Sequence, residues 1–283
     1  MTDLTNDESD RLVEDWMMFM RWMYDVPTWL LAILIIGAFV SVALLGLFIT
    51  HRRIHKSSLA TVIDNGTVGW FFSGVSVLYG LTLGLITVAT WGNYATATAI
   101  ASNESAAIAV LYRDLMGYPE PLQGELRNRL KAYTRTIIDH SWPAQQQGAI
   151  SLKETSRLDE FQDAFLNGES QAESRAMLHA EALRAFNQMI ELRRQRLDSI
   201  KGNVPGVLWS VVLIGALATI TFSFFFLITN FSLHATMTGI LAGMIGLLIF
   251  LLVVLDHPYW GEVSVTPEAY ESVYTTLMDR VRK

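Results

Sequence analysis

The side chains that could do chemistry in this chain are six histidines, a run of arginines and scattered carboxylates. No Gly-rich phosphate loop, zinc-helix signature, nucleophile elbow or pair of carboxylates at catalytic spacing is present in the sequence. The histidines do not cluster, since they stand at His51, His55, His140, His179, His234 and His257. We therefore expect neither enzymatic activity nor a cofactor.

Two charged groups remain as candidate sites. Asp256, His257 and Glu262 could hold a metal ion with help from oxygen ligands, but we favour a polar cluster that ends an apolar segment and holds no metal. The run Arg193-Arg-Gln-Arg196, with Lys201, is interpreted as a patch facing solvent or lipid headgroups. The alternative is that it attracts anions to a pore mouth. The absence of Cys excludes disulfides and thiolate metal sites.

Four long apolar segments must position these groups. The chain of 283 residues has a formal charge of -6, and its apolar residues are concentrated in blocks. A helix needs about 20 apolar residues to cross a bilayer, and the segments 28–50, 68–94, 205–229 and 234–255 meet this length. No Asp, Glu, Lys or Arg lies inside them, so an intramembrane carboxylate relay is not expected. The sequence predicts a multi-pass membrane protein whose partner is lipid, not nucleic acid.

The second segment begins a helix that we expect to run from Asn65 to Val110, half in lipid and half outside. One face of it carries a small-residue stripe, spaced mostly three or four residues apart. The members within or next to the span are our candidates for lining a pore: Ser73, Gly80, Gly84, Thr87, Trp91 and Tyr94. Such a stripe packs against another helix or faces water, and the sequence leaves both alternatives open.

Outside the spans, the pattern predicts helices throughout. Residues 1–27 include an amphipathic helix at 10–25, which lies on the membrane or docks on a neighbouring subunit. A basic loop, 51–67, ends in an Asn65-Gly66 turn. The extramembrane domain, 95–204, contains helices near 122–142, 152–166 and 171–200, the first ending at Trp142-Pro143. After the last span, 256–283 form a turn and a helix that begins at Pro267 with Thr266 as N-cap.

Small residues also mark the fourth span. Gly239, Gly243 and Gly246 follow each other at steps of four and three residues, which allow close approach of a second helix. We interpret these glycines as helix-packing positions.

Several short motifs together resemble the bacterial bestrophin-like membrane proteins. They are Asn65-Gly66-x-x-Gly69, Trp91 with Tyr94 and Glu104 on the long helix, Tyr133 on the next, and Asp256-His-Pro258-Tyr259-Trp-Gly261 after the last span. The likeness extends over nearly the whole chain after Pro27. It implies an all-α, four-span fold with a helical domain between spans 2 and 3.

Bestrophins are pentameric ion channels whose second span lines the pore, so the resemblance implies a homo-oligomer, suggested to be a pentamer, that passes an inorganic ion. A bestrophin calcium-binding segment follows the fourth span and is rich in acidic residues. Here Pro258, Tyr259 and Gly261 are similar to its opening, but only Glu262 follows. We therefore expect no calcium site. The alternative function is a non-conducting scaffold or sensor whose helical domain binds a partner protein.

Two indications of orientation conflict. Arg52, Arg53 and Lys56 favour a cytoplasmic first loop, which would place the helical domain outside. The resemblance implies the reverse, and the basic residues at 193–201 balance the charge count. We expect a bacterial inner-membrane protein with its helical domain and both termini in the cytoplasm.

Overall fold

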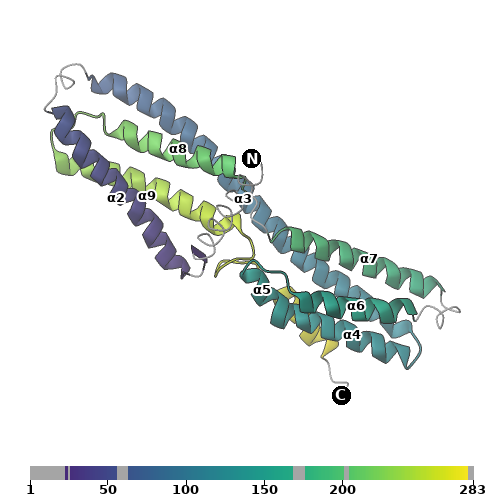
Figure 1. The fold of residues 1–283 in the computed structure, drawn as a ribbon. Helices are drawn as coiled ribbons and strands as arrows, with labels where there is room; N and C mark the ends of the chain where they lie inside the picture. Colours follow the sequence, from purple (N-terminus) through teal and green to yellow (C-terminus); the bar gives the residue numbers. More distant parts are fainter. Residues whose placement is uncertain (1–22, 25, 56–62, 168–175, 201–203, 280–283) are drawn as a thin grey trace, which may run out of the picture. The chain divides into compact units, whose positions relative to one another are not determined.

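The computed structural model describes residues 23–24, 26–55, 63–167, 176–200 and 204–279 (Figure 1). Within these ranges all regular structure is helical. The predicted all-α class is therefore confirmed. The predicted amphipathic helix at 10–25 lies outside the described residues except for 23–24.

Four of the described helices are long and apolar enough to cross a membrane. They are α2 (Thr28–His55), α3 (Asn65–Asp114), α8 (Gly206–Ser223) and α9 (Phe231–Asp256). The chain divides into two compact units. A span unit comprises Met1–Gly92 and Asn203–Asp256, and a helical unit comprises Asn93–Gly202 and His257–Lys283. α3 begins in the first and ends in the second.

The start of α3 differs from the predicted Asn-Gly turn. Asn65 and Gly66 lie in the first turn of the helix, because Asp64 caps it: the Thr67 amide donates to Asp64 Oδ2 over 2.8 Å. Asn65 itself pairs with the backbone of Leu227, accepting from its amide at 2.8 Å and donating to its carbonyl at 3.0 Å. This pairing satisfies a backbone stretch that follows the end of α8 at Ser223, whereas the predicted span continued to residue 229.

Within the span unit, α2 and α9 pack closely. A Cβ added to Gly246 would lie 3.1 Å from the Ile36 Cα atom, so the α2 backbone passes directly over this glycine. α3 and α8 meet at Tyr79, whose hydroxyl donates to the Val212 carbonyl over 3.2 Å. In the most apolar window of α3 only 11% of residues are buried, against 50% in α9. Most of the α3 surface in the span unit is therefore left uncovered by its own chain.

The helical unit combines the end of α3 with several shorter helices around one core. These are η2 (Leu115–Gly117), α4 (Leu122–Thr136), η3 (Ile137–Ser141), α5 (Trp142–Gln146), α6 (Leu152–Asn167), α7 (Ala176–Asp198), α10 (Glu268–Val273) and η6 (Tyr274–Met278). Leucines of α4 at steps of four residues point into the core, together with Phe161 and Phe165 of α6. Trp142 is 2% exposed and donates its indole N–H to the Val265 carbonyl over 2.9 Å. The segment after α9 is thus part of this core.

Two predicted helix boundaries are corrected. The helix that begins at Leu122 does not stop at Trp142-Pro143. It passes through the π-helical η3 into α5, and Pro143 lies in the first turn of α5, where a missing N–H is tolerated. The C-terminal helix begins at Glu268, with Pro267 and not Thr266 at the N-cap position.

Candidate functional site

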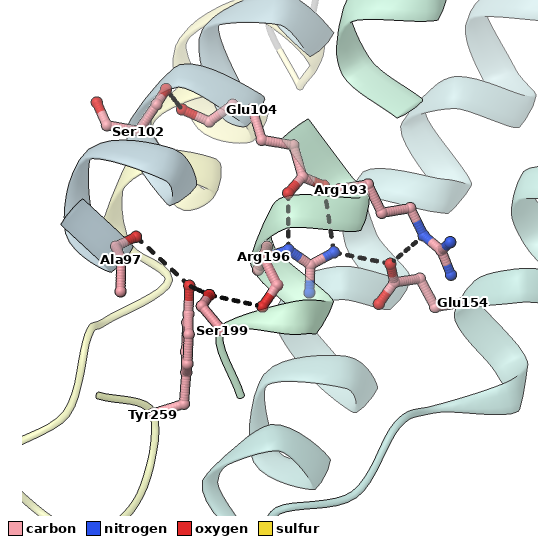
Figure 2. A network of polar contacts seen from close by, with 9 residues as sticks. Ala97, Ser102, Glu104, Glu154, Arg193, Arg196, Ser199 and Tyr259 are labelled. Atoms are coloured by element: carbon pink, nitrogen blue, oxygen red, sulfur yellow. Dashed lines mark hydrogen bonds and ion pairs between the residues drawn. The ribbon is translucent and has the colours of Figure 1, made fainter. Parts of the chain in front are cut away.

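The helical unit buries a network of four charged side chains (Figure 2). Arg196 lies at its centre, with Nε 2.7 Å from Glu104 Oε2 and Nη2 2.7 Å from Glu154 Oε1. Arg193 Nε lies 2.7 Å from the same Glu154 oxygen. The side chains of Arg196 and Glu104 are 0% exposed and that of Glu154 is 1% exposed. Two arginines and two carboxylates therefore form a charge-balanced cluster whose central side chains are not exposed to solvent.

Three helices supply these residues. Glu104 projects from α3, Glu154 from the first turn of α6, and Arg193 and Arg196 from α7, where their three-residue spacing places both on one face. The network therefore ties the extramembrane half of α3 to α6 and α7. Charge-assisted hydrogen bonds of this length are among the stronger contacts available to side chains.

Electrostatics within the network favour the charged forms. Burial alone would raise the pKa of Glu154, but the charges of Arg196 and Arg193 outweigh it and hold the pKa below its usual value. For Arg196, burial acts to lower the pKa, and the carboxylates of Glu104 and Glu154 reverse this and raise it. Glu154 and Arg196 therefore stay charged at physiological pH.

Aromatic residues surround the network. The Arg196 guanidinium carbon lies 5.8 Å from the centre of the Trp142 ring. Tyr133 and Tyr270 are 0% exposed, and burial raises the pKa of both hydroxyls well above the ordinary value. On the other side the Tyr259 hydroxyl lies 3.4 Å from both the Ala97 carbonyl and Ser199 Oγ, as Figure 2 shows. Both carboxylates of the network pair with arginines from another helix, an arrangement suited to fixing helices.

The prediction of a solvated arginine patch is wrong for two of its three arginines. Arg193 is mostly buried and Arg196 completely so, while Arg194 remains 77% exposed. Arg193 and Arg196 stand on the inner face of α7 and Arg194 stands on the outer face. The arginine run in the sequence does not show this difference in burial. The available signal is the three-residue spacing of Arg193 and Arg196, which places both on one face of a helix. Glu104 belongs to the motifs of the family resemblance, and no pattern in the sequence marks Glu154.

The small-residue stripe lies along α3 without cover from its own chain at several positions. Ser73, Gly80, Gly84 and Trp91 are exposed, and Thr87 and Tyr94 are partly buried. A Cβ added at Gly80 or Gly84 would meet no atom within 4 Å. Glycines of the other span helices differ among themselves: a Cβ at Gly215 would lie 2.4 Å from the Tyr79 ring, whereas a Cβ at Gly37 or Gly206 would meet no atom within 4 Å.

The glycines of α9 are not equivalent. Gly246 lies against the α2 backbone, and Gly243 has Val40 of α2 at 3.8 Å from an added Cβ. A Cβ at Gly239 would meet nothing within 4 Å. The buried face of α9 passes through Thr238, Ala242 and Ile245, so Gly239 stands at its edge.

At the end of α9 and in the turn after it, the Asp256 carboxylate and a backbone amide make hydrogen bonds within the chain. Asp256 is 2% exposed; its Oδ1 accepts the Val204 amide at 2.9 Å and its Oδ2 accepts the Trp209 indole N–H at 3.4 Å. Val265 donates its amide to the Pro258 carbonyl over 2.8 Å, and Gly261 has φ of 71°, which favours glycine. Glu262 is exposed. Among the residues that the structure describes, no group of three His, Asp or Glu side chains is placed to hold a metal ion.

Together the elements define an all-helical membrane protein with four candidate spans and a helical unit whose larger part lies between the second and third of them. The family model for the Bestrophin-like domain matches residues 24–270. The chain therefore belongs to the bestrophin-like family, as the short motifs indicated. No curated protein matches the sequence.

Solved structures with this fold come from a bacterial bestrophin homologue of Klebsiella pneumoniae. One single-substitution variant aligns with a TM-score of 0.65 at 11% identity, covering 86% of this chain and 98% of that chain. A second variant has a TM-score of 0.63 at 11% identity, with 87% and 97% covered. A further structure of the homologue has a TM-score of 0.62 at 11% identity, with 86% and 97% covered. At this identity the likeness establishes the fold.

Proposed function

We propose that this chain is one subunit of a homo-oligomeric ion channel, a pentamer in a bacterial inner membrane, whose pore is lined by α3. One observation carries the proposal. The face of α3 that bears the small-residue stripe is uncovered by its own chain: no atom lies within 4 Å of a Cβ added at Gly80 or Gly84, and Ser73 is exposed. Together with membership of the bestrophin-like family, this supports a face of α3 reserved for a symmetry axis.

The ionic network gives this pore helix a fixed support. Glu104 stands on α3 beyond the membrane, and its contacts with Arg196 at 2.7 and 3.2 Å join α3 to α7. A pore of defined width needs lining helices that do not rotate or slide, and a bidentate Arg–carboxylate pair restrains both motions. The network is proposed as a structural anchor for the pore helix, not as an ion-binding site.

The alternative is a non-conducting scaffold or sensor whose helical unit binds a partner protein. That function predicts a stripe buried against helices of its own subunit. The exposed positions of Ser73, Gly80 and Gly84 do not favour it.

Planar-bilayer recording of the purified protein tests the proposal. We expect ionic current that is absent from bilayers receiving a mock preparation, and particles with fivefold symmetry when the same sample is imaged. Absence of current under all ionic conditions, in particles with a different symmetry, would contradict it. An innermost helix other than α3 would retain a channel but overturn the assignment of its lining.

A further inference from the structure

Two loops of the helical unit present large apolar side chains outward. One is 147–151 with the first residue of α6, where Ile150 is 53% and Leu152 is 84% exposed; the other is 260–265, in which Val263 is 42% exposed. The loops lie side by side, because Gln146 Nε2 is 3.4 Å from Ser264 Oγ and a Cβ at Gly148 would be 2.5 Å from the Trp260 ring. We call Ile150, Leu152 and Val263 the apolar rim.

The position of the rim within the helical unit follows from chain connectivity. The neighbouring Tyr259 reaches the Ala97 carbonyl of α3 at 3.4 Å. Ala97 comes five residues after Gly92, the last α3 residue of the span unit, which is about 7.5 Å along a helix. His257 directly follows α9. The rim is thus at the end of the helical unit from which the chain enters the spans.

That position indicates what covers the rim. The headgroup layer of a bilayer extends roughly 5–8 Å beyond the hydrocarbon on each side, and Trp side chains such as Trp260 are favoured there. Lys153, next to Leu152, is exposed and suits a phosphate group. We propose that the apolar rim inserts into the boundary between headgroups and acyl chains, so that the helical unit is held on the lipid surface as well as by its covalent connections.

The opposite end of the helical unit provides a matched control. Met177 is 88% exposed, as apolar as Leu152 and on the same unit. Its neighbour Leu178 lies against Gly117, where a Cβ would be 2.4 Å from a Leu178 methyl. Gly117 is 20 residues beyond Ala97, about 30 Å in helical geometry. Met177 is therefore expected in water.

The absence of Cys from the chain makes a direct experiment possible. Full-length Leu152→Cys, Ile150→Cys and Met177→Cys variants are each spin-labelled and reconstituted in phosphatidylcholine–phosphatidylglycerol liposomes. Collision rates with oxygen, which concentrates in lipid, and with a neutral nickel chelate, which stays in water, are then measured. Size-exclusion chromatography confirms that each variant keeps the oligomeric state of the unlabelled protein. Because all three side chains are exposed, labelling disturbs no core contact.

We expect labels at positions 150 and 152 to gain oxygen collisions and lose nickel collisions relative to the label at position 177. Nickel collisions as frequent at 152 as at 177 would overturn the proposal in favour of a rim in water. An immobilised label at 152 that meets neither reagent would overturn it in favour of a contact with protein, such as a neighbouring subunit. Should Leu152→Cys fail to assemble, Val263→Cys gives the same three distinguishable results.

Discussion

Arg196 is fully buried, and its guanidinium pairs with two carboxylates from different helices. A buried ion pair is not necessarily more stable than a well-packed apolar replacement, but removal of one partner leaves an uncompensated charge in a medium that solvates it poorly. The network therefore makes the helical unit sensitive to single substitutions at Arg196 and Glu104. Its contacts join Glu104 of α3 and Glu154 of α6 to α7, so the network restrains the relative positions of these three helices.

Substitution of Arg196 by leucine tests this dependence. Arg196→Leu leaves Glu104 without an ion-pair partner at 0% exposure, and we expect a loss of about 3–5 kcal/mol in unfolding free energy. The matched control is Arg194→Leu on the same helix, where the side chain is 77% exposed and a change within about 0.5 kcal/mol is expected. Thermal unfolding in detergent measures both. Equal losses of unfolding free energy in the two variants would show that the buried ion pairs of Arg196 do not contribute to stability.

The pH dependence of stability tests Glu154. Its folded pKa is held below the ordinary value, so the unfolded chain takes up this proton first, near pH 4.3. The stabilisation is therefore present above about pH 4.3 and is lost as pH falls through the folded pKa. We expect the melting temperature of the wild type to fall more steeply below this pH than that of Glu154→Gln. Glu160→Gln, on the same helix with its side chain 43% exposed, should keep the wild-type slope.

At the scale of elements, α3 combines two surfaces along one continuous helix. In the helical unit its inner face is buried, with Ile108 and Leu111 at 0% exposure. In the span unit it is covered at few positions, and large side chains such as Trp70, Val77 and Val88 are 83%, 69% and 70% exposed. Large apolar positions fit lipid, and the small-residue stripe fits either a pore or the neighbouring subunit. In the proposed assembly, copies of α3 around one axis would complete the surroundings of the stripe.

Glycine substitutions separate these surfaces. Under the proposed function, Gly80→Leu and Gly84→Leu narrow the pore and should reduce single-channel current several-fold. Gly74→Leu is the control, because Gly74 also has no atom within 4 Å of an added Cβ but lies about 80° or more around the helix from Gly80 and Gly84. Bilayer recording of particles with unchanged elution volume measures the effect. Loss of current in all three variants, or in none, would argue against the assigned lining.

At the scale of the whole molecule, the family membership and the uncovered α3 surface both favour several copies around one axis. We expect detergent-solubilised particles to show five copies with α3 innermost. Single-particle imaging determines the number directly. A ring of another size would correct the proposed stoichiometry, and a monomer would remove the basis for a pore on a symmetry axis.

Orientation is a separate property of the whole molecule. The proposal places the helical unit and both termini in the cytoplasm. A reporter enzyme that is active only in the periplasm should therefore remain inactive when fused after Lys283, and a cytoplasm-active reporter should function there. Activity of the periplasmic reporter would show that the proposed orientation is wrong. The correct orientation would then be the one that Arg52 and Arg53 favour, with the first loop in the cytoplasm.

The sequence by itself determined the helical class, the four apolar segments and the family. Helix formation and membrane crossing depend on local properties, namely the length of an apolar run, the period of its polar positions and the placement of Pro and Gly. Helix boundaries are harder to predict from the sequence where a hydrogen bond from a distant part of the chain decides where a helix begins or ends. The Asn65 amide, for example, is paired with Leu227 far along the chain, and Pro143 is accommodated after a π-helical turn.

Only the tertiary structure decided which charged residues are buried. Arg194 and Arg196 stand two positions apart in one polar run, yet one is solvated and the other is held by Glu104 and Glu154, which lie 92 and 42 residues away. The three-residue spacing of Arg193 and Arg196 places both on one face of the helix, but it does not show that this face is buried, because the free energy of burying a charge depends on partners brought together by folding. For the same reason the sequence could place the stripe on one face of α3, and only the packed chain left Gly80 and Gly84 open.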